Sequence, residues 1–193
     1  MTMPHPRQSS SGPLGRAVLA GALALAVSGC GFFTEPDHRP APGPSPAVAL
    51  PPAGDCPPSG VRVDAGRVDG AMGLRAMTLT LTNCSGRPYR VNGYPSVRVL
   101  DEKGAPLTGV RTVQGTDQVP MAPEDPGAEP FTLSPGESAR SALYWRMAAE
   151  NGTYLRVVPR KGRPAVNVRP PETLDIGPEN TLGTTAWAAP SRP

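Results

Sequence analysis

Proline and glycine occur too often along this chain for long helices to form. Of its 193 residues, 27 are Pro and 22 are Gly, which together make about a quarter of the chain. Either residue destabilises a helix interior, proline by about 3 kcal/mol. The 38% of hydrophobic residues and the small net charge still provide material for a core, which argues against a wholly disordered chain. The sequence therefore predicts short segments joined by turns.

The first 29 residues have the pattern of an export signal. Residues 1–16 are polar and their only charged side chains are Arg7 and Arg16, and residues 17–27 form an uninterrupted apolar run. Small residues follow this run, as at a secretory cleavage site. A membrane-spanning helix needs about 20 apolar residues, and this run is about half as long. The pattern predicts a signal peptide over 1–29 and a chain that leaves the cytoplasm.

The expected cleavage site is more specific than a secretory signal requires. Its sequence, Val27-Ser28-Gly29-Cys30, resembles the lipobox of bacterial lipoproteins. The resemblance implies that the Cys30 sulfur receives a diacylglyceryl group and that Cys30 becomes the N-terminus after cleavage. Two or more acyl chains anchor a protein stably, whereas one chain binds only marginally. We therefore expect a protein of the cell membrane, held by lipid at the extracytoplasmic face; the alternative is a plain signal peptide with a coincidental cysteine.

The count of three cysteines agrees with this assignment. An odd number of cysteines in an exported protein needs an explanation, and lipid on Cys30 leaves Cys56 and Cys84 as one pair. In an oxidising compartment this pair is expected to form a disulfide. A zinc site is the competing interpretation, but two distant thiolates with no histidine nearby lack the four ligands that zinc prefers.

The segment after the signal is dominated by proline. Nine of the 25 residues over 34–58 are Pro, mixed with Ala and small polar residues. Such a segment favours extended polyproline-like conformations and cannot bury a core. We expect a tether over 30–54 that holds a single domain, over 55–190, clear of the lipid headgroups. A ligand for proline-recognising modules is the weaker interpretation.

The expected domain has the pattern of many short β-strands. Apolar and polar residues alternate with a period of two, most clearly where Met77, Leu79 and Leu81 are separated by threonines. Turn signals such as Ser85-Gly86 and Asn151-Gly152 separate the runs. This spacing predicts an all-β fold, an immunoglobulin-like antiparallel β-sandwich. The alternating runs lie at 61–63, 77–81, 89–91, 97–99, 143–147, 155–157 and 166–168.

Several of these segments carry a family resemblance. The chain is similar to the actinobacterial domain-of-unknown-function family 4232 over residues 56–188. The resemblance implies an exported, often lipid-anchored protein with an immunoglobulin-like β-sandwich, and it implies no activity. Many members place a cysteine near the position of Tyr89, whereas this chain has Cys84 directly after Asn83. The segments are Thr80-Leu81-Thr82-Asn83, Ser85-Gly86, Asn92-Gly93-Tyr94-Pro95 with Val97 and Leu100, and Leu133-Ser134-Pro135-Gly136-Glu137.

Charge and histidine content exclude several classes of function. Without the two signal-peptide arginines, the chain has 17 basic and 16 acidic residues, too even a balance for a general nucleic-acid-binding surface. Both histidines, His5 and His38, fall outside the expected domain. The domain therefore lacks a Ser-His-Asp or Cys-His nucleophile and a zinc site built on imidazole. We predict no nucleic-acid partner, no catalytic residue, no metal and no cofactor.

Acidic residues leave two alternatives open. The adjacent pairs Asp101/Glu102 and Glu124/Asp125 could support glycoside hydrolysis, but neighbours in an extended strand point to opposite faces. The 120–130 segment, with Glu124, Asp125 and Glu129, could ligate calcium through carboxylate and backbone oxygens. It lacks the ordered alternation of a known calcium loop. We expect turn and loop residues in both cases.

The 92–95 segment is the most distinctive local motif. Gly93 is suited to a positive φ in a tight turn, and Pro95 biases Tyr94 toward an extended conformation. Tyr94 is either an exposed binding residue or a corner residue whose hydroxyl bonds backbone, and the corner role is favoured. Trp145, in an alternating run, is expected in the core, whereas Trp187 has no clear assignment.

Together these features predict a non-catalytic, lipid-anchored module that presents a β-sandwich to the cell envelope. Binding residues on such a fold usually lie on loops, so a protein or glycan of the envelope would be bound there, with Tyr94 as the candidate residue. One alternative is a structural envelope spacer without a specific ligand. Another is a hydrolase that uses carboxylates.

Overall fold

The computed structural model describes residues 55–177 and 180–190. These residues form twelve β-strands and no helix, so they contain no helix that could cross a membrane. The predicted signal peptide, Cys30 and the tether over 30–54 lie outside the described residues. The prediction of an all-β sandwich is confirmed.

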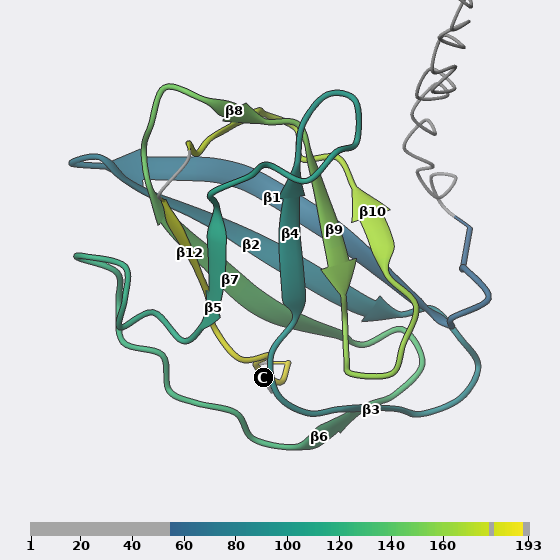
Figure 1. The fold of residues 1–193 in the computed structure, drawn as a ribbon. Helices are drawn as coiled ribbons and strands as arrows, with labels where there is room; N and C mark the ends of the chain where they lie inside the picture. Colours follow the sequence, from purple (N-terminus) through teal and green to yellow (C-terminus); the bar gives the residue numbers. More distant parts are fainter. Residues whose placement is uncertain (1–54, 178–179, 191–193) are drawn as a thin grey trace, which may run out of the picture. The chain divides into compact units, whose positions relative to one another are not determined.

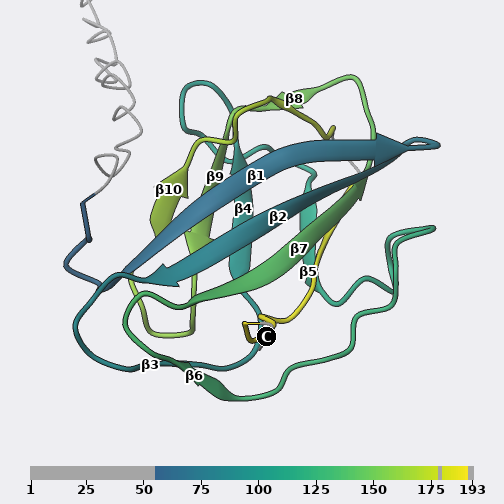
Figure 2. The ribbon, with the colours of Figure 1, turned by 180° about the vertical axis from the view of Figure 1, so that it is seen from behind.

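Two sheets form the layers of the sandwich, with β4, β9 and β10 in front of β1, β2 and β7 in Figure 1 and behind them in Figure 2. The first sheet has five strands, in the order β1 (Val61–Ala71), β2 (Leu74–Asn83), β7 (Ser138–Arg146), β12 (Thr181–Thr184) and β5 (Arg111–Gln114). The second has three, in the order β10 (Val166–Val168), β9 (Tyr154–Val158) and β4 (Ser96–Leu100). Two short pairs complete the fold: β11 (Leu174–Asp175) with β8 (Asn151–Gly152), and β3 (Tyr89–Val91) with β6 (Phe131–Leu133).

One pairing departs from the expected antiparallel arrangement. β12 lies antiparallel to β7 on one side and parallel to β5 on the other. Parallel neighbours cannot be joined by a tight hairpin and need a long crossover connection. The chain from β6 to β11 provides that connection between β5 and β12.

The core lies between the two sheets and follows the predicted alternation. In β2 the inward side chains of Met77, Leu79 and Leu81 are at most 2% exposed, and in β7 Leu143 and Trp145 are fully buried. Burial of apolar surface is the main stabilising contribution, at about 25 cal/mol per Å² removed from water. Other strands bury their predicted inward positions too: Val61, Val63, Tyr89, Val91, Val97, Val99, Leu155, Val157 and Val168.

Met147 is an exception to the predicted alternation, because its side chain is 54% exposed. β7 ends at Arg146, and the Met147 N–H donates to Gly73 O at 2.9 Å. The Met147 sulfur accepts a hydrogen bond from Arg75 Nη2 at 3.8 Å. The strand thus ends before the apolar alternation in the sequence does.

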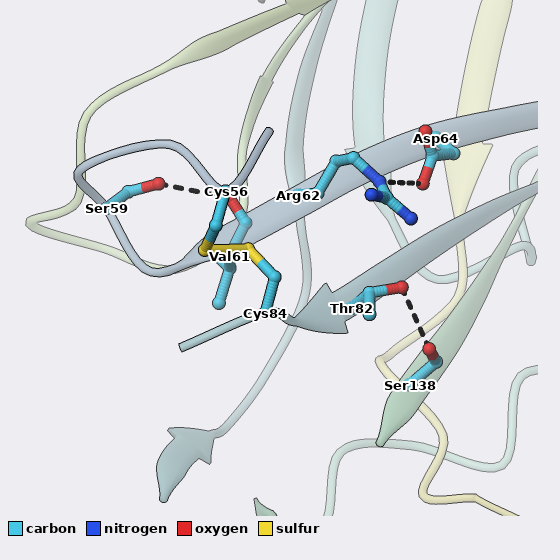
Figure 3. A network of polar contacts seen from close by, with 8 residues as sticks. All are labelled: Cys56, Ser59, Val61, Arg62, Asp64, Thr82, Cys84 and Ser138. Atoms are coloured by element: carbon cyan, nitrogen blue, oxygen red, sulfur yellow. Dashed lines mark hydrogen bonds and ion pairs between the residues drawn. A yellow bond between two sulfur atoms is a disulfide. The ribbon is translucent and has the colours of Figure 1, made fainter. Parts of the chain in front are cut away.

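Cys56 and Cys84 form a disulfide, as predicted, with their Cα atoms 5.5 Å apart. Figure 3 shows that the bridge joins the segment before β1 to the residue that follows β2. The Ser85 N–H also donates to Gly60 O at 3.2 Å, and the hydroxyls of Thr82 and Ser138 are 2.8 Å apart. This end of the β1–β2 hairpin is therefore tied covalently and by hydrogen bonds.

Asn83, the last residue of β2, is fully buried and uses all the hydrogen-bonding capacity of its side chain. Its Nδ2 donates to Arg87 O at 2.8 Å and to Leu133 O at 3.0 Å. Its Oδ1 accepts from Ser85 N at 3.1 Å and from Ser85 Oγ at 2.8 Å. One amide thus closes the turn after β2 and ties it to the end of β6.

Replacing both Cys56 and Cys84 with serine should lower the free energy of unfolding by about 3.5 kcal/mol. In the chain-entropy model, a bridge across a sequence separation of 28 restricts the unfolded chain by about that amount. Urea denaturation measures the difference, and reduction of the native chain should reproduce it. An unchanged denaturation midpoint would contradict a stabilising role for the bridge.

The substitution Asn83→Ala should lower the free energy of unfolding by about 3 kcal/mol. It removes four hydrogen bonds of a fully buried side chain, each of which contributes about 0.5–1.5 kcal/mol. Ser85 keeps its bonds to Gly60 O and Arg87 O, so the loss is smaller than the sum of four unpaired groups. Asn151→Ala, at an exposed strand position, is the matched control and should change stability by less than about 0.5 kcal/mol. Equal effects of the two variants would rule out the special role of Asn83.

Candidate functional site

The 92–95 segment joins β3 to β4 and is held by a hydrogen bond from Trp187. Gly93 has φ of +83°, so the predicted positive φ is confirmed. The Trp187 N–H donates to Gly93 O at 3.0 Å, and its indole Nε1 donates to Pro159 O at 2.8 Å. Because Trp187 is only 2% exposed, it is a core residue that fixes the position of this turn.

Tyr94 is partly buried, and its hydroxyl donates to Asp125 Oδ2 at 2.7 Å. The expectation that this hydroxyl bonds backbone is therefore wrong, since its partner is a carboxylate 31 residues further along the chain. This hydrogen bond, then burial, then the charge of Asp125 raise the pKa of Tyr94 above its ordinary value of 10.0. At neutral pH the phenol stays protonated and acts as a hydrogen-bond donor.

The loop that carries Asp125 connects β5 to β6 and is built into the fold. Asp125 Oδ1 accepts a hydrogen bond from Ala186 N at 3.2 Å. Thr116, which is 4% exposed, donates through Oγ1 to Pro123 O at 2.6 Å. These contacts hold the loop against the C-terminal part of the domain, so the Tyr94–Asp125 pair has a defined position.

Met121, in the same loop, has a backbone conformation that non-glycine residues rarely adopt, with φ of +70°. The only other described non-glycine residue with positive φ is Met72, at +51°. Met72 and Gly73 form the two-residue turn between β1 and β2, where both positions require positive φ. Arg146 donates to Met121 Sδ at 3.7 Å and to Met72 O at 3.0 Å. Strain such as that at Met121 is found preferentially at functional sites.

Tyr94 lines an acidic hollow of about 690 Å³. Its lining includes Asp117, Glu124 and Asp125 and no basic residue. The three carboxylates do not converge on one point, because the described part of the chain has no group of three or more His, Cys, Asp or Glu that could hold a metal ion. The hollow therefore offers several separate acceptors.

A second, basic hollow of about 440 Å³ shares Tyr94 and Gln114 with the acidic one. Its lining includes Arg90, Arg160 and Lys161 and no acidic residue. Arg160 also lies over the buried ring of Tyr89, with Cζ 5.7 Å from the ring centroid. The buried Nε of Arg160 has no hydrogen-bond partner within the described residues.

The remaining candidates lie where turn and loop residues were expected. Asp101 accepts hydrogen bonds from Lys103 N at 2.9 Å and Ala105 N at 2.8 Å, which closes the turn after β4. Glu102 is exposed in the same turn, and Glu124 and Asp125 lie in the β5–β6 loop. Both histidines lie outside the described residues.

The sequence had indicated Tyr94 and the acidic 120–130 segment separately, but not that they meet. It gives no indication of the basic hollow, whose Arg90 and Arg160 come from segments about 70 residues apart in the chain. The pattern of charges gives no signal for this hollow, because Arg90 is brought beside Arg160 and Lys161 only by the tertiary structure.

These features define a disulfide-braced β-sandwich domain with a polar surface of both charges around one tyrosine. The chain matches the family described as Domain of unknown function (DUF4232) over residues 56–188, which is more than half of its length, and it belongs to that family. No curated protein matches the chain, and no solved structure matches it. The match covers both sheets and the residues around Tyr94, so the family extends over the whole candidate site.

At alkaline pH the native chain should lose stability as Tyr94 ionises. The Tyr94→Phe variant has no phenol to ionise at this position, so its stability should fall less over the same pH range. The folded chain holds the Tyr94 proton more tightly than the unfolded chain, so this stabilisation is complete below pH 10.0 and is lost as pH rises through the raised pKa. Urea denaturation between pH 8 and pH 12 measures the trend, and phenolate absorbance follows the titration. Tyr144→Phe, whose hydroxyl makes no hydrogen bond to the described residues, is the control. Identical alkaline profiles for Tyr94→Phe and the native chain would contradict the assignment.

Proposed function

We propose that this protein is an extracytoplasmic lipoprotein whose sandwich domain binds a ligand of the cell envelope through the surface around Tyr94. Lipid on Cys30 anchors the chain to the cell membrane, and the proline-rich tether holds the domain away from the headgroups. The domain acts as a non-catalytic binding module.

Support for the anchor comes from the linear sequence. An apolar run over 17–27 precedes Val27-Ser28-Gly29-Cys30, which resembles a lipobox. The disulfide between Cys56 and Cys84 leaves Cys30 as the unpaired cysteine and suits an oxidising compartment. Two acyl chains on Cys30 would give stable attachment.

Support for binding comes chiefly from the arrangement at Tyr94. The acidic and the basic hollow share Tyr94 and Gln114, and Tyr94 offers an aromatic face and a hydroxyl fixed by Asp125. A ligand that carries both an amino and a carboxyl group, such as a peptide or an amino-sugar glycan, would find complementary charges on the two sides. Because the loops are braced by Trp187 and Asp125, little ordering would be needed on binding.

Cys30→Ser should release the chain from the membrane fraction, because the diacylglyceryl group has no sulfur to join. Cell fractionation measures this, and mass spectrometry of the N-terminal peptide should find the lipid on Cys30 of the native chain. Cys56→Ser, which removes a sulfur from the domain, should leave the chain in the membrane fraction. A free Cys30 thiol in the native chain would overturn the anchor.

Site-specific photo-crosslinking in the producing cell tests the binding surface. A crosslinking residue at position 94 should repeatedly capture one partner, whereas the same residue at the exposed Asp69 of β1 should not. Arg160→Gln and Asp125→Asn should each reduce the capture. Failure to capture any partner at position 94 would favour a structural envelope spacer instead.

A further inference from the structure

Two arginines lie directly opposite each other on the outer face of the three-stranded sheet. Arg98 of β4 pairs in register with Arg156 of β9. In each strand the neighbouring residues point into the core, and Val97, Val99 and Leu155 are at most 3% exposed. The two guanidinium groups therefore project from the same outward surface, which faces the viewer in Figure 1.

A third arginine reaches this face. Arg169 Cζ lies 5.6 Å from the centroid of the Tyr154 ring, and Tyr154 precedes the inward Leu155 on β9. Within the described residues, Arg98, Arg156 and Arg169 make no ion pair with a carboxylate. The ion pairs of this part of the chain involve Arg62, Arg67 and Arg75 instead. Although the overall charge is nearly balanced, this face is basic.

A hollow of about 390 Å³ opens at the same place. Its lining includes Ser96 and Arg98 of β4, Arg156 of β9 and Gly104 of the turn after β4. The nearby Asp101 directs its carboxylate to backbone N–H groups of that turn instead of to the arginines. The lining shares no residue with the two hollows at Tyr94.

Like charges directly opposite on neighbouring strands destabilise a sheet. An anion between the two side chains would turn this repulsion into attraction. Each guanidinium presents a planar fork of N–H donors that matches two oxygens of a phosphate. We propose that this outer face of the second sheet is a binding site for a phosphoryl oxyanion, held by Arg98 and Arg156 with Ser96 as a further donor.

The site predicts two opposite effects for one substitution. Without an anion, Arg98→Gln removes the repulsion and should raise the unfolding temperature at low ionic strength. With phosphate, the same variant has lost half of the paired donors, so its affinity should fall about tenfold. If Arg98 had a purely structural role, its replacement would neither raise the unfolding temperature nor selectively lower the affinity for phosphate.

The experiment uses the full chain purified in detergent, and follows thermal unfolding in inorganic phosphate and in sodium chloride of equal ionic strength. A bound ligand raises the unfolding temperature with concentration, so phosphate should stabilise the native chain more than chloride does. Arg98→Gln and Arg156→Gln should each lose most of that difference. Arg98→Lys keeps the charge but not the fork, so it should lose phosphate affinity without gaining stability.

Arg140→Gln is the matched control, because Arg140 is an exposed arginine on β7 that lies opposite Thr80 instead of another arginine. It should keep the full phosphate response. Equal stabilisation by phosphate and chloride, or an unchanged phosphate response in Arg98→Gln and Arg156→Gln, would overturn the proposal.

The source of the phosphoryl group is settled by a second measurement. The Cys30→Ser chain, which lacks the lipid acceptor, is sedimented with vesicles that contain phosphatidylglycerol, and with vesicles of phosphatidylcholine alone. If the chain binds the phosphatidylglycerol vesicles and Arg98→Gln abolishes this binding, the ligand is a lipid headgroup. A phosphate response without vesicle binding supports a soluble phosphate, and absence of both contradicts the site.

Discussion

The fold depends on one layer of apolar side chains that the two sheets share. A sheet of three or five strands cannot bury its inner face without a second layer, so neither sheet would be stable alone. Leu81 and Trp145 from the first sheet and Leu155 from the second are all fully buried in this layer. Because the layer decides which side of each strand faces inward, it also places Arg98 and Arg156 together on the outside.

Three polar side chains at the margin of this layer have specific hydrogen-bond partners, which help define how the loops connect to the sheets. The indole of Trp145 donates to Asp175 Oδ1 at 3.1 Å, and Arg75 pairs with the other oxygen of Asp175 at 2.8 Å. Asn83 plays the same part at the opposite end of β2, beside the disulfide of Cys84. A buried polar group without a partner would be costly, so these contacts select one arrangement of the loops.

Prediction from the sequence succeeded for strands in which apolar and polar residues alternate, and failed for strands without this alternation. The runs around Leu79 and Val157 identified β2 and β9, because burial of one face imposes a period of two. β12 lacks an alternation of apolar and polar residues, because its third residue is Gly183. A Cβ at this position would lie 2.9 Å from both Gly115 O and Val119 Cγ2. Tight packing against a neighbouring loop explains this glycine, and that neighbour is known only from the tertiary structure.

The sequence by itself determined the β-rich class of the domain, the pairing of Cys56 with Cys84 and the turn at Gly93. These depend on local periodicity, on counting and on the backbone freedom of a single residue. Only the tertiary structure decided that Tyr94 meets Asp125 and that Arg98 faces Arg156. Strand order and register set such encounters, and they follow from how all the apolar faces are buried together, which no local stretch of sequence records.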